Sequence, residues 1–160
     1  MAIEIVREYL KSFQKDGEIL EFAESSATVE LAAIRLGVEP ARIAKTLALY
    51  DASGEKTVLV IAAGDAKVDN GKFRGFFSFR AKMLRPEDVQ RLTGHAVGGV
   101  CPFANPFGTP VYADVSLLRF STVFPACGSS NSAIELTCEE LFSFSLAREW
   151  IDVCKLPDAQ

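Results

Sequence analysis

The single histidine of this 160-residue chain lies in a stretch that reads HAVGGVCPFANPFGTP, residues 95–110. The same stretch holds one of the four cysteines, three glycines and three of the seven prolines. Glycine permits close approach of the backbone and unusual φ values, whereas proline fixes φ and removes an N–H donor. The stretch is therefore expected to be rigid without joining a regular strand. It fits either a stiff connection between two strands or a wall of main-chain N–H groups that faces a ligand.

His95 and Cys101 are six residues apart in this stretch, and a Cys–His pair can generate a nucleophilic thiolate. Catalytic pairs of this kind usually come from separate elements, and no acidic residue stands nearby to orient the histidine. The spacing therefore favours structural roles for both side chains. A thiol hydrolase that uses Cys101 and His95 remains an alternative.

The glycine pair offers different chemistry. Gly98 and Gly99 permit a turn that points successive N–H groups into one concavity, and Pro102 stiffens its far side. Such a nest can stabilise an oxyanion without a side-chain nucleophile, and one donor of this type contributes about 10²- to 10³-fold in rate. Lys45, followed by Thr46, stands where a short helix is expected to give way to a strand. Lysine is a poor base at its usual pKa of about 10.4 but a good point charge for a phosphate. Without further context, Lys45 would be an ordinary solvated lysine.

Other catalytic machinery is absent from the sequence. No phosphate-binding G-x-x-x-x-G-K-[ST] motif occurs. The acidic pairs at 87–88 and 139–140 fall at expected helix N-termini, where the helix dipole accounts for them. The four cysteines form no C-x-x-C pair, and one histidine is too few for the usual mixed zinc sites. We expect no metal and no cofactor.

Composition indicates an ordinary globular protein, with 49% hydrophobic and 24% charged residues, and its length fits one domain spanning 1–160. The longest apolar runs are too short to cross a bilayer, and the N-terminus carries charges where a signal peptide needs apolar residues. We therefore expect a cytoplasmic protein with reduced thiols and no membrane partner. The net charge of −4 has the wrong sign for gripping a polyanion along its length, so contact with a nucleic acid must be local or assisted.

Periodicity and end signals predict the elements that would position these residues. Helices are expected over 2–14, from caps at 25–28 to Leu36 with Gly37 as the stop, briefly from Pro40, over 71–77 and 85–94, as a turn at 116–120, and from a capping box at Thr137 to about Trp150. Strands are expected over 18–24, in a hairpin with a four-residue loop at 51–54, and over 81–84, 111–113, 122–127 and 133–136, with a frayed tail at 155–160. Hairpins mixed with helices, without regular βαβ alternation, favour an α+β domain with a mixed, curved sheet.

Three segments, in this order and at these separations, resemble the YbaK/ProRS-associated family of prolyl-tRNA editing domains. They are RIAKTL (42–47), TGHAVGGVCPF (93–103) and VFPACGSSNSAIELTCEEL (123–141). The family comprises free-standing aminoacyl-tRNA deacylases and the insertion domain of bacterial prolyl-tRNA synthetase. The likeness spans about residues 15–148 and implies one compact α+β domain around a mixed, barrel-like sheet.

The resemblance also implies roles for individual residues. Lys45 would orient the 3′-terminal nucleotide of the substrate, and a main-chain wall would surround the scissile ester. The residues of that wall are Gly98, Gly99, Val100, Cys101 and Pro102, with Cys101 as a variable residue that need not be a nucleophile. Candidates for substrate binding are Thr46, His95, Gly128, Ser129, Ser130 and Asn131. His95 is expected to be a packed residue or one at the pocket edge, and GSSNS (128–132) also reads as a plain polar turn.

The resemblance implies an enzyme that hydrolyses the ester of a mischarged tRNA, with tRNA(Pro) carrying alanine, cysteine or serine as the expected substrate. A synthetase pocket rejects small isosteres by only about 10- to 200-fold, which creates the need for a separate hydrolytic site. Some related proteins carry glycine, lysine and arginine in the third segment, or an aspartate near position 133. This chain has no counterpart of those residues, so the preferred amino acid stays open. Prolyl-tRNA synthetase or an elongation factor could deliver the tRNA. A non-catalytic module that binds tRNA or the synthetase is a further alternative.

Overall fold

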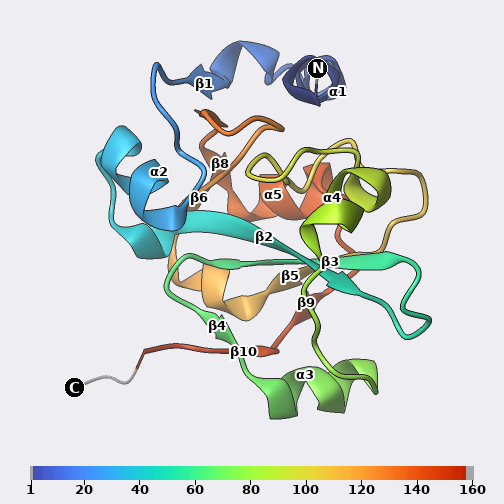
Figure 1. Ribbon diagram of the computed structural model, residues 1–160. Helices are drawn as coiled ribbons and strands as arrows, with labels where there is room; N and C mark the ends of the chain where they lie inside the picture. Colours follow the sequence, from blue (N-terminus) through green and yellow to red (C-terminus); the bar gives the residue numbers. More distant parts are fainter. Residues whose placement is uncertain (1, 158–160) are drawn as a thin grey trace.

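A mixed sheet of six strands, in the order β8-β6-β2-β3-β5-β9, forms the centre of the computed structural model, which describes residues 2–157 (Figure 1). In spatial order the strands are β8 (Leu136–Thr137), β6 (Thr122–Pro125), β2 (Ile43–Tyr50), β3 (Thr57–Ala63), β5 (Val111–Asp114) and β9 (Trp150–Ile151). Pairing is antiparallel for β2 with β3 and β6 with β8, and parallel for β2 with β6, β3 with β5 and β5 with β9. The α+β class with a mixed, curled sheet is confirmed.

The long pair β2 and β3 forms the middle of the core. All seven residues of β3 are buried, as expected for a strand covered on both faces. The pair runs from Ala44↔Ala63 to Tyr50↔Thr57, so the connecting loop spans 51–56. The predicted loop at 51–54 is therefore wrong in its end, which lies two residues later, and a hydrogen bond of 2.9 Å from the Asp51 N–H to the Lys56 carbonyl joins the two ends of the observed loop.

Helices and short 3₁₀ turns surround the sheet (Figure 1). The helices are α1 (Ala2–Lys11), α2 (Val29–Leu36), α3 (Asn70–Phe77), α4 (Pro86–Thr93) and α5 (Cys138–Phe144), and the 3₁₀ turns are η1 (Asp16–Glu18), η2 (Pro40–Arg42) and η3 (Val115–Arg119). The predicted ends of α2 are confirmed, because Thr28 caps its start and Gly37 ends it at a φ of +69°. None of the helices within 2–157 is long and apolar enough to cross a membrane.

Two small antiparallel pairs lie outside the main sheet. β1 (Leu20–Glu21) pairs with β7 (Ser132–Ala133), and β4 (Lys67–Val68) pairs with β10 (Cys154–Lys155). The expected strands over 18–24 and 133–136 are thus shorter than predicted, and the expected strand over 81–84 contributes only a bridge between Met83 and Leu49. These segments have strand-like patterns, but each pairs with a neighbouring strand over only one or two residues, which is too short for a longer ladder.

The C-terminal part of the chain differs most from expectation. The capping box at Thr137 is confirmed, with reciprocal hydrogen bonds to Glu140, but α5 ends at Phe144 instead of near Trp150. Leu146 has a φ of +59°, which turns the chain out of the helix, and Trp150 then joins β9 beside β5. Lys155 belongs to β10 and so is not frayed, while residues 158–160 of the predicted tail lie outside the described residues.

Candidate functional site

A cavity of about 220 Å³ lies where the start of β2, the start of α2 and the glycine loop at 98–100 meet. Lys45, Thr46, Gly98 and Val100 all line it, so the structure brings together residues from two sequence segments about 50 positions apart. The rest of the wall is apolar or carries hydroxyl groups. It consists of Ser26, Ala27, Thr28, Val29, Ala32, Ile43, Ala44, Phe124, Ala126, Ser132 and Ala133.

Lys45 is placed by β2 and by the turn that follows β3. It pairs with Ala62 across the hairpin, and its Nζ donates to the carbonyl oxygens of Gly64, at 3.3 Å, and Ala66. An ammonium group has three N–H donors, so one remains for a ligand. Burial lowers the pKa of Lys45 below its ordinary value, and the charge of nearby Asp65 acts in the opposite direction.

Close packing explains why glycine stands at the start of that turn. A β-carbon on Gly64 would lie 2.1 Å from the Pro40 carbonyl oxygen and 2.8 Å from Cγ1 of Val29. Only glycine therefore allows the turn to lie against η2 and α2. The turn is also closed by a hydrogen bond of 3.0 Å from the Ala66 N–H to the Ala63 carbonyl.

The glycine loop forms a tight turn beside the cavity. Gly98 has a φ of +88°, a region that favours glycine, and the Gly99 N–H donates to the Ala96 carbonyl at 2.9 Å. The Gly99 N–H, one of the expected donors to a ligand, is therefore already used. The N–H groups of Gly98, Val100 and Cys101 make no hydrogen bond to any residue within 2–157. Gly98 and Val100 line the cavity, so their N–H groups are available to bind an anionic oxygen there, whereas Cys101 is buried and does not line it.

The segment 123–141, the third of those that carry the family resemblance, packs directly against this glycine loop. A β-carbon on Gly99 would lie 3.1 Å from the Gly128 carbonyl oxygen, and one on Gly98 would lie 3.8 Å from Cβ of Ser130. Gly128, Ser129, Ser130 and Asn131 are not among the residues that line the cavity. The cavity contacts from this segment come instead from Phe124 and Ala126, before the turn, and from Ser132 and Ala133 of β7, after it.

The polar groups of this segment hold a strap at 22–28. The Ser130 carbonyl accepts from the Ser26 N–H at 2.7 Å, and Asn131 Nδ2 donates to the Phe22 carbonyl at 2.8 Å. Ser129 Oγ donates to Asn131 Oδ1 at 2.9 Å, which orients that amide. These residues therefore support the cavity wall indirectly. Sequence reasoning missed the strap as a wall, because hydroxyl residues before a helix are expected as caps; Thr28 is indeed a cap and also lines the cavity.

His95 and Cys101 are buried beneath the loop and do not line the cavity. Cys101 Sγ lies 3.5 Å from His95 Nε2, and the same nitrogen lies 2.9 Å from the Phe103 carbonyl oxygen. Burial raises the pKa of the Cys101 thiol to about 12 and lowers the pKa of His95. Both shifts favour the neutral form of each group. Pro102 lies on the far side of the loop, where it borders a separate cavity.

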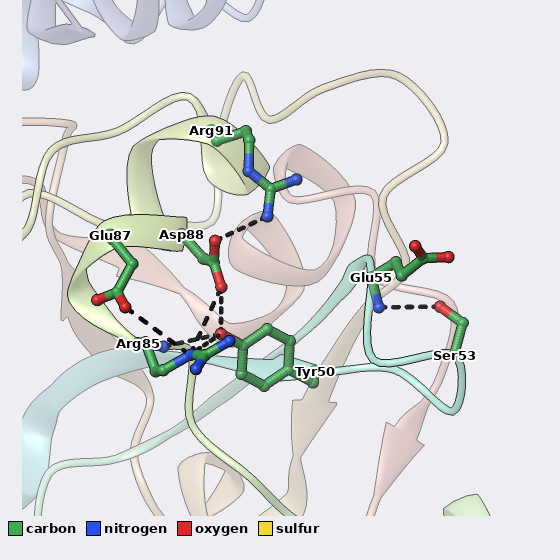
Figure 2. Close-up of polar contacts among 7 residues, drawn as sticks. All are labelled: Tyr50, Ser53, Glu55, Arg85, Glu87, Asp88 and Arg91. Atoms are coloured by element: carbon green, nitrogen blue, oxygen red, sulfur yellow. Dashed lines mark hydrogen bonds and ion pairs between the residues drawn. The ribbon is translucent and has the colours of Figure 1, made fainter.

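Thr46 and α4 complete the surroundings of the site. Thr46 lines the cavity, and its buried Oγ1 has no hydrogen-bond partner within 2–157. Figure 2 shows how β2 also anchors α4, the helix that leads into the glycine loop. The Tyr50 hydroxyl donates to the Asp88 carboxylate and accepts from the Arg85 N–H at 3.2 Å, and Arg91 donates to Asp88 at 2.7 Å. β2 therefore carries Lys45 near its start, and Tyr50 at its end holds α4, the helix that leads into the glycine loop.

The chain is similar to proteins of known sequence. The family described as aminoacyl-tRNA editing domain matches residues 23–144. The protein YwhH of Bacillus subtilis (strain 168), named as uncharacterized, is 52% identical over 155 residues, which cover 97% of this chain and 98% of YwhH. EbsC of Enterococcus faecalis (strain ATCC 700802 / V583), whose name proposes a Cys-tRNA(Pro)/Cys-tRNA(Cys) deacylase, is 29% identical over 130 residues, covering 78% of this chain and 77% of EbsC.

Solved structures share the whole fold. The crystal structure of a proposed trans-editing enzyme for prolyl-tRNA synthetase matches with a TM-score of 0.85 at 27% identity, covering 96% of this chain and 97% of that chain. The crystal structure of the hypothetical protein APE2540 matches with a TM-score of 0.82 at 29% identity, covering 94% and 99%.

Proposed function

Because the chain belongs to the aminoacyl-tRNA editing domain family, an identity that supports hydrolysis of mischarged aminoacyl-tRNA, we propose that its substrate is tRNA(Pro) carrying a small non-cognate amino acid. Alanine, cysteine and serine are the candidates. The names of EbsC and of the trans-editing enzyme, which refer to Cys-tRNA(Pro) and to prolyl-tRNA synthetase, support this choice.

The size of the cavity is the observation that carries the proposal. At about 220 Å³ it is smaller than the roughly 300–1,000 Å³ of pockets that bury a drug-sized ligand. It has room for an aminoacyl group while the nucleotide stays at the mouth. The apolar wall would accept a small side chain and exclude a large one, as a hydrolytic sieve requires.

The proposed mechanism needs no catalytic side-chain nucleophile. Water attacks the ester carbonyl carbon, and the N–H groups of Gly98 and Val100, the two loop residues that line the cavity, stabilise the oxyanion that develops. The bond from that carbon to the ribose oxygen then breaks, and the proton released by the water ends on the ribose oxygen, with the substrate itself assisting the transfer. The free N–H of Lys45 holds the 3′-terminal nucleotide, and Thr46 Oγ1 offers an unused polar group beside it.

The proposed partners follow from charge. With a net charge of −4, the chain lacks the excess of cations that would bind a whole tRNA through its phosphates. We therefore propose contact with the acceptor end alone, with prolyl-tRNA synthetase or an elongation factor presenting the tRNA.

Single-turnover deacylation tests the proposal. Alanyl-, cysteinyl-, seryl- and prolyl-tRNA(Pro) are incubated with excess wild-type protein, the Lys45→Ala variant and the matched control Lys56→Ala, which alters an exposed lysine of the hairpin loop. We expect fast loss of at least one small non-cognate amino acid, slow loss of proline, and a decrease of about 10²-fold for Lys45→Ala only. Equal rates for all four esters, or full activity of Lys45→Ala, would contradict the proposal.

A further inference from the structure

The position of the Lys45 ammonium group depends on a turn that no part of the proposed mechanism uses directly. Its Nζ is held by the carbonyls of Gly64 and Ala66, the two residues on either side of Asp65. Any displacement of this turn would displace the ammonium group as well. What fixes the turn therefore also fixes Lys45.

The 3₁₀ turn η3 holds this turn at two points. Arg119 donates through Nη1 and Nη2 to the two carboxylate oxygens of Asp65, at 3.0 and 2.6 Å. Its Nε donates to the Ser116 carbonyl at 2.9 Å, and Ser116 Oγ accepts from the Ala63 N–H at 3.1 Å. A guanidinium that binds both oxygens of a carboxylate fixes orientation as well as distance.

A role in overall stability does not account well for this ion pair. The Arg119 and Asp65 side chains keep 34% and 25% of their surface exposed, and exposed pairs contribute little to the free energy of unfolding. Neither residue lines the cavity, so neither is placed to touch the substrate. The geometric consequence of the pair is the placement of the carbonyls on either side of Asp65.

We propose that Asp65 and Arg119 are positioning residues for Lys45. Their ion pair holds the carbonyls of Gly64 and Ala66 so that these use two N–H groups of the ammonium and direct the third toward the substrate. The inference rests on the proposed role of Lys45 in deacylation.

Replacement of the two members of the pair is expected to shift the pKa of Lys45 in opposite directions, which allows position to be separated from electrostatics. Asp65 raises the pKa of Lys45, so Asp65→Asn is expected to lower that pKa. Arg119→Gln leaves the Asp65 carboxylate without its cation, and is expected to raise the pKa of Lys45. Cys154, Glu30 and Lys67, the other titratable side chains that act on Lys45, stay in place in both variants.

The experiment measures the single-turnover rate at saturating protein, with whichever aminoacyl-tRNA the wild type cleaves fastest. NMR titration of the Lys45 side chain reports its pKa, and thermal unfolding reports folding. We expect Asp65→Asn and Arg119→Gln each to lower the rate by about tenfold, although they shift the pKa in opposite directions, because small misplacements of a catalytic group are costly. The double variant should be no slower than either single one, since the pair acts as a unit.

Two further variants make the test specific. Lys72→Gln removes a surface ion pair of 3.1 Å with Asp152 and is expected to keep the wild-type rate. Arg119→Lys keeps the charge but loses the two-armed contact, and is expected to fall between wild type and Arg119→Gln, so it serves if the glutamine variant is poorly folded.

The outcomes separate this inference from the proposed function. If Lys45→Ala is slow while both pair variants cleave at the wild-type rate, the positioning role is overturned and the proposed function stands. Rates that move in opposite directions with the pKa of Lys45 would also overturn it, because the pair would then act only through charge. A fully active Lys45→Ala variant overturns the role of Lys45 itself, and this inference with it.

Discussion

Replacing Cys101 with alanine is expected to leave ester hydrolysis intact, and this result separates a main-chain mechanism from a thiol mechanism. The Cys101 side chain is fully buried, and burial raises the pKa of its thiol to about 12. At about pH 7.5 only about 3 in 10⁵ such thiols would be ionised, so a thiolate mechanism would begin about 6 kcal/mol uphill. A deficit of that size would cancel most of the advantage of a nucleophilic sulfur.

The neighbouring histidine does not supply the missing base. His95 Nε2 lies 2.9 Å from the Phe103 carbonyl oxygen, which can only accept, so this nitrogen carries the hydrogen. It is also the ring nitrogen that faces Cys101 Sγ, at 3.5 Å, and it therefore has no lone pair free for the thiol proton. Burial lowers the pKa of His95, which disfavours the imidazolium that a thiolate pair requires.

The assay compares wild type, Cys101→Ala and the matched control Cys127→Ala, which alters another buried cysteine with a raised pKa. Single-turnover rates are measured from about pH 6.5 to 9, and urea unfolding gives the free energy of unfolding. We expect rates within about twofold of wild type and a loss of about 1 kcal/mol of stability for each variant. A folded Cys101→Ala protein without activity, together with a wild-type rate that rises about tenfold per pH unit, would refute this reasoning.

Three further predictions concern the supports of the site. Gly64→Ala is expected to lower the free energy of unfolding by more than about 2 kcal/mol in urea, because the new β-carbon would meet the Pro40 carbonyl oxygen at 2.1 Å. Hydrogen bonds, first from Tyr50 and then from Arg91, lower the pKa of Asp88 below its unfolded value of about 3.9. The contribution of Asp88 to the free energy of unfolding is therefore complete above that unfolded pKa and is lost as the pH falls through the folded pKa. Thermal midpoints measured down to about pH 2.5 should therefore fall less steeply for Asp88→Asn than for wild type. Thr137→Ala removes the cap of α5 and is expected to cost about 1 kcal/mol in urea, whereas Thr137→Ser should cost much less.

Local signals in the sequence predicted local structure well. The Thr28 cap, the Gly37 stop and the capping box at Thr137 each depend on hydrogen bonds within one turn, so a few neighbouring residues determine them. The end of α5 depends on distant contacts instead. The residues after Phe144 have acceptable helix propensity, yet pairing of Trp150 with Ala113 in β5 favours a strand, and the helix stops six residues earlier than expected.

The candidate site shows the same division between local and distant causes. The glycine pair predicted a tight turn, but which N–H groups stay free depends on where that turn closes, and its closure onto Ala96 removes the Gly99 N–H. Lys45 became a candidate through resemblance, whereas its position depends on carbonyl oxygens about 20 residues away, and every residue carries a carbonyl oxygen. The sequence did hold one sign of this contact, a Gly-Asp pair directly after a buried strand, where a side chain on Gly64 could not fit. Because the binding groups are main-chain atoms, substitutions at the site should act mainly by moving the backbone, so the residues that constrain these turns determine activity as much as those that line the cavity.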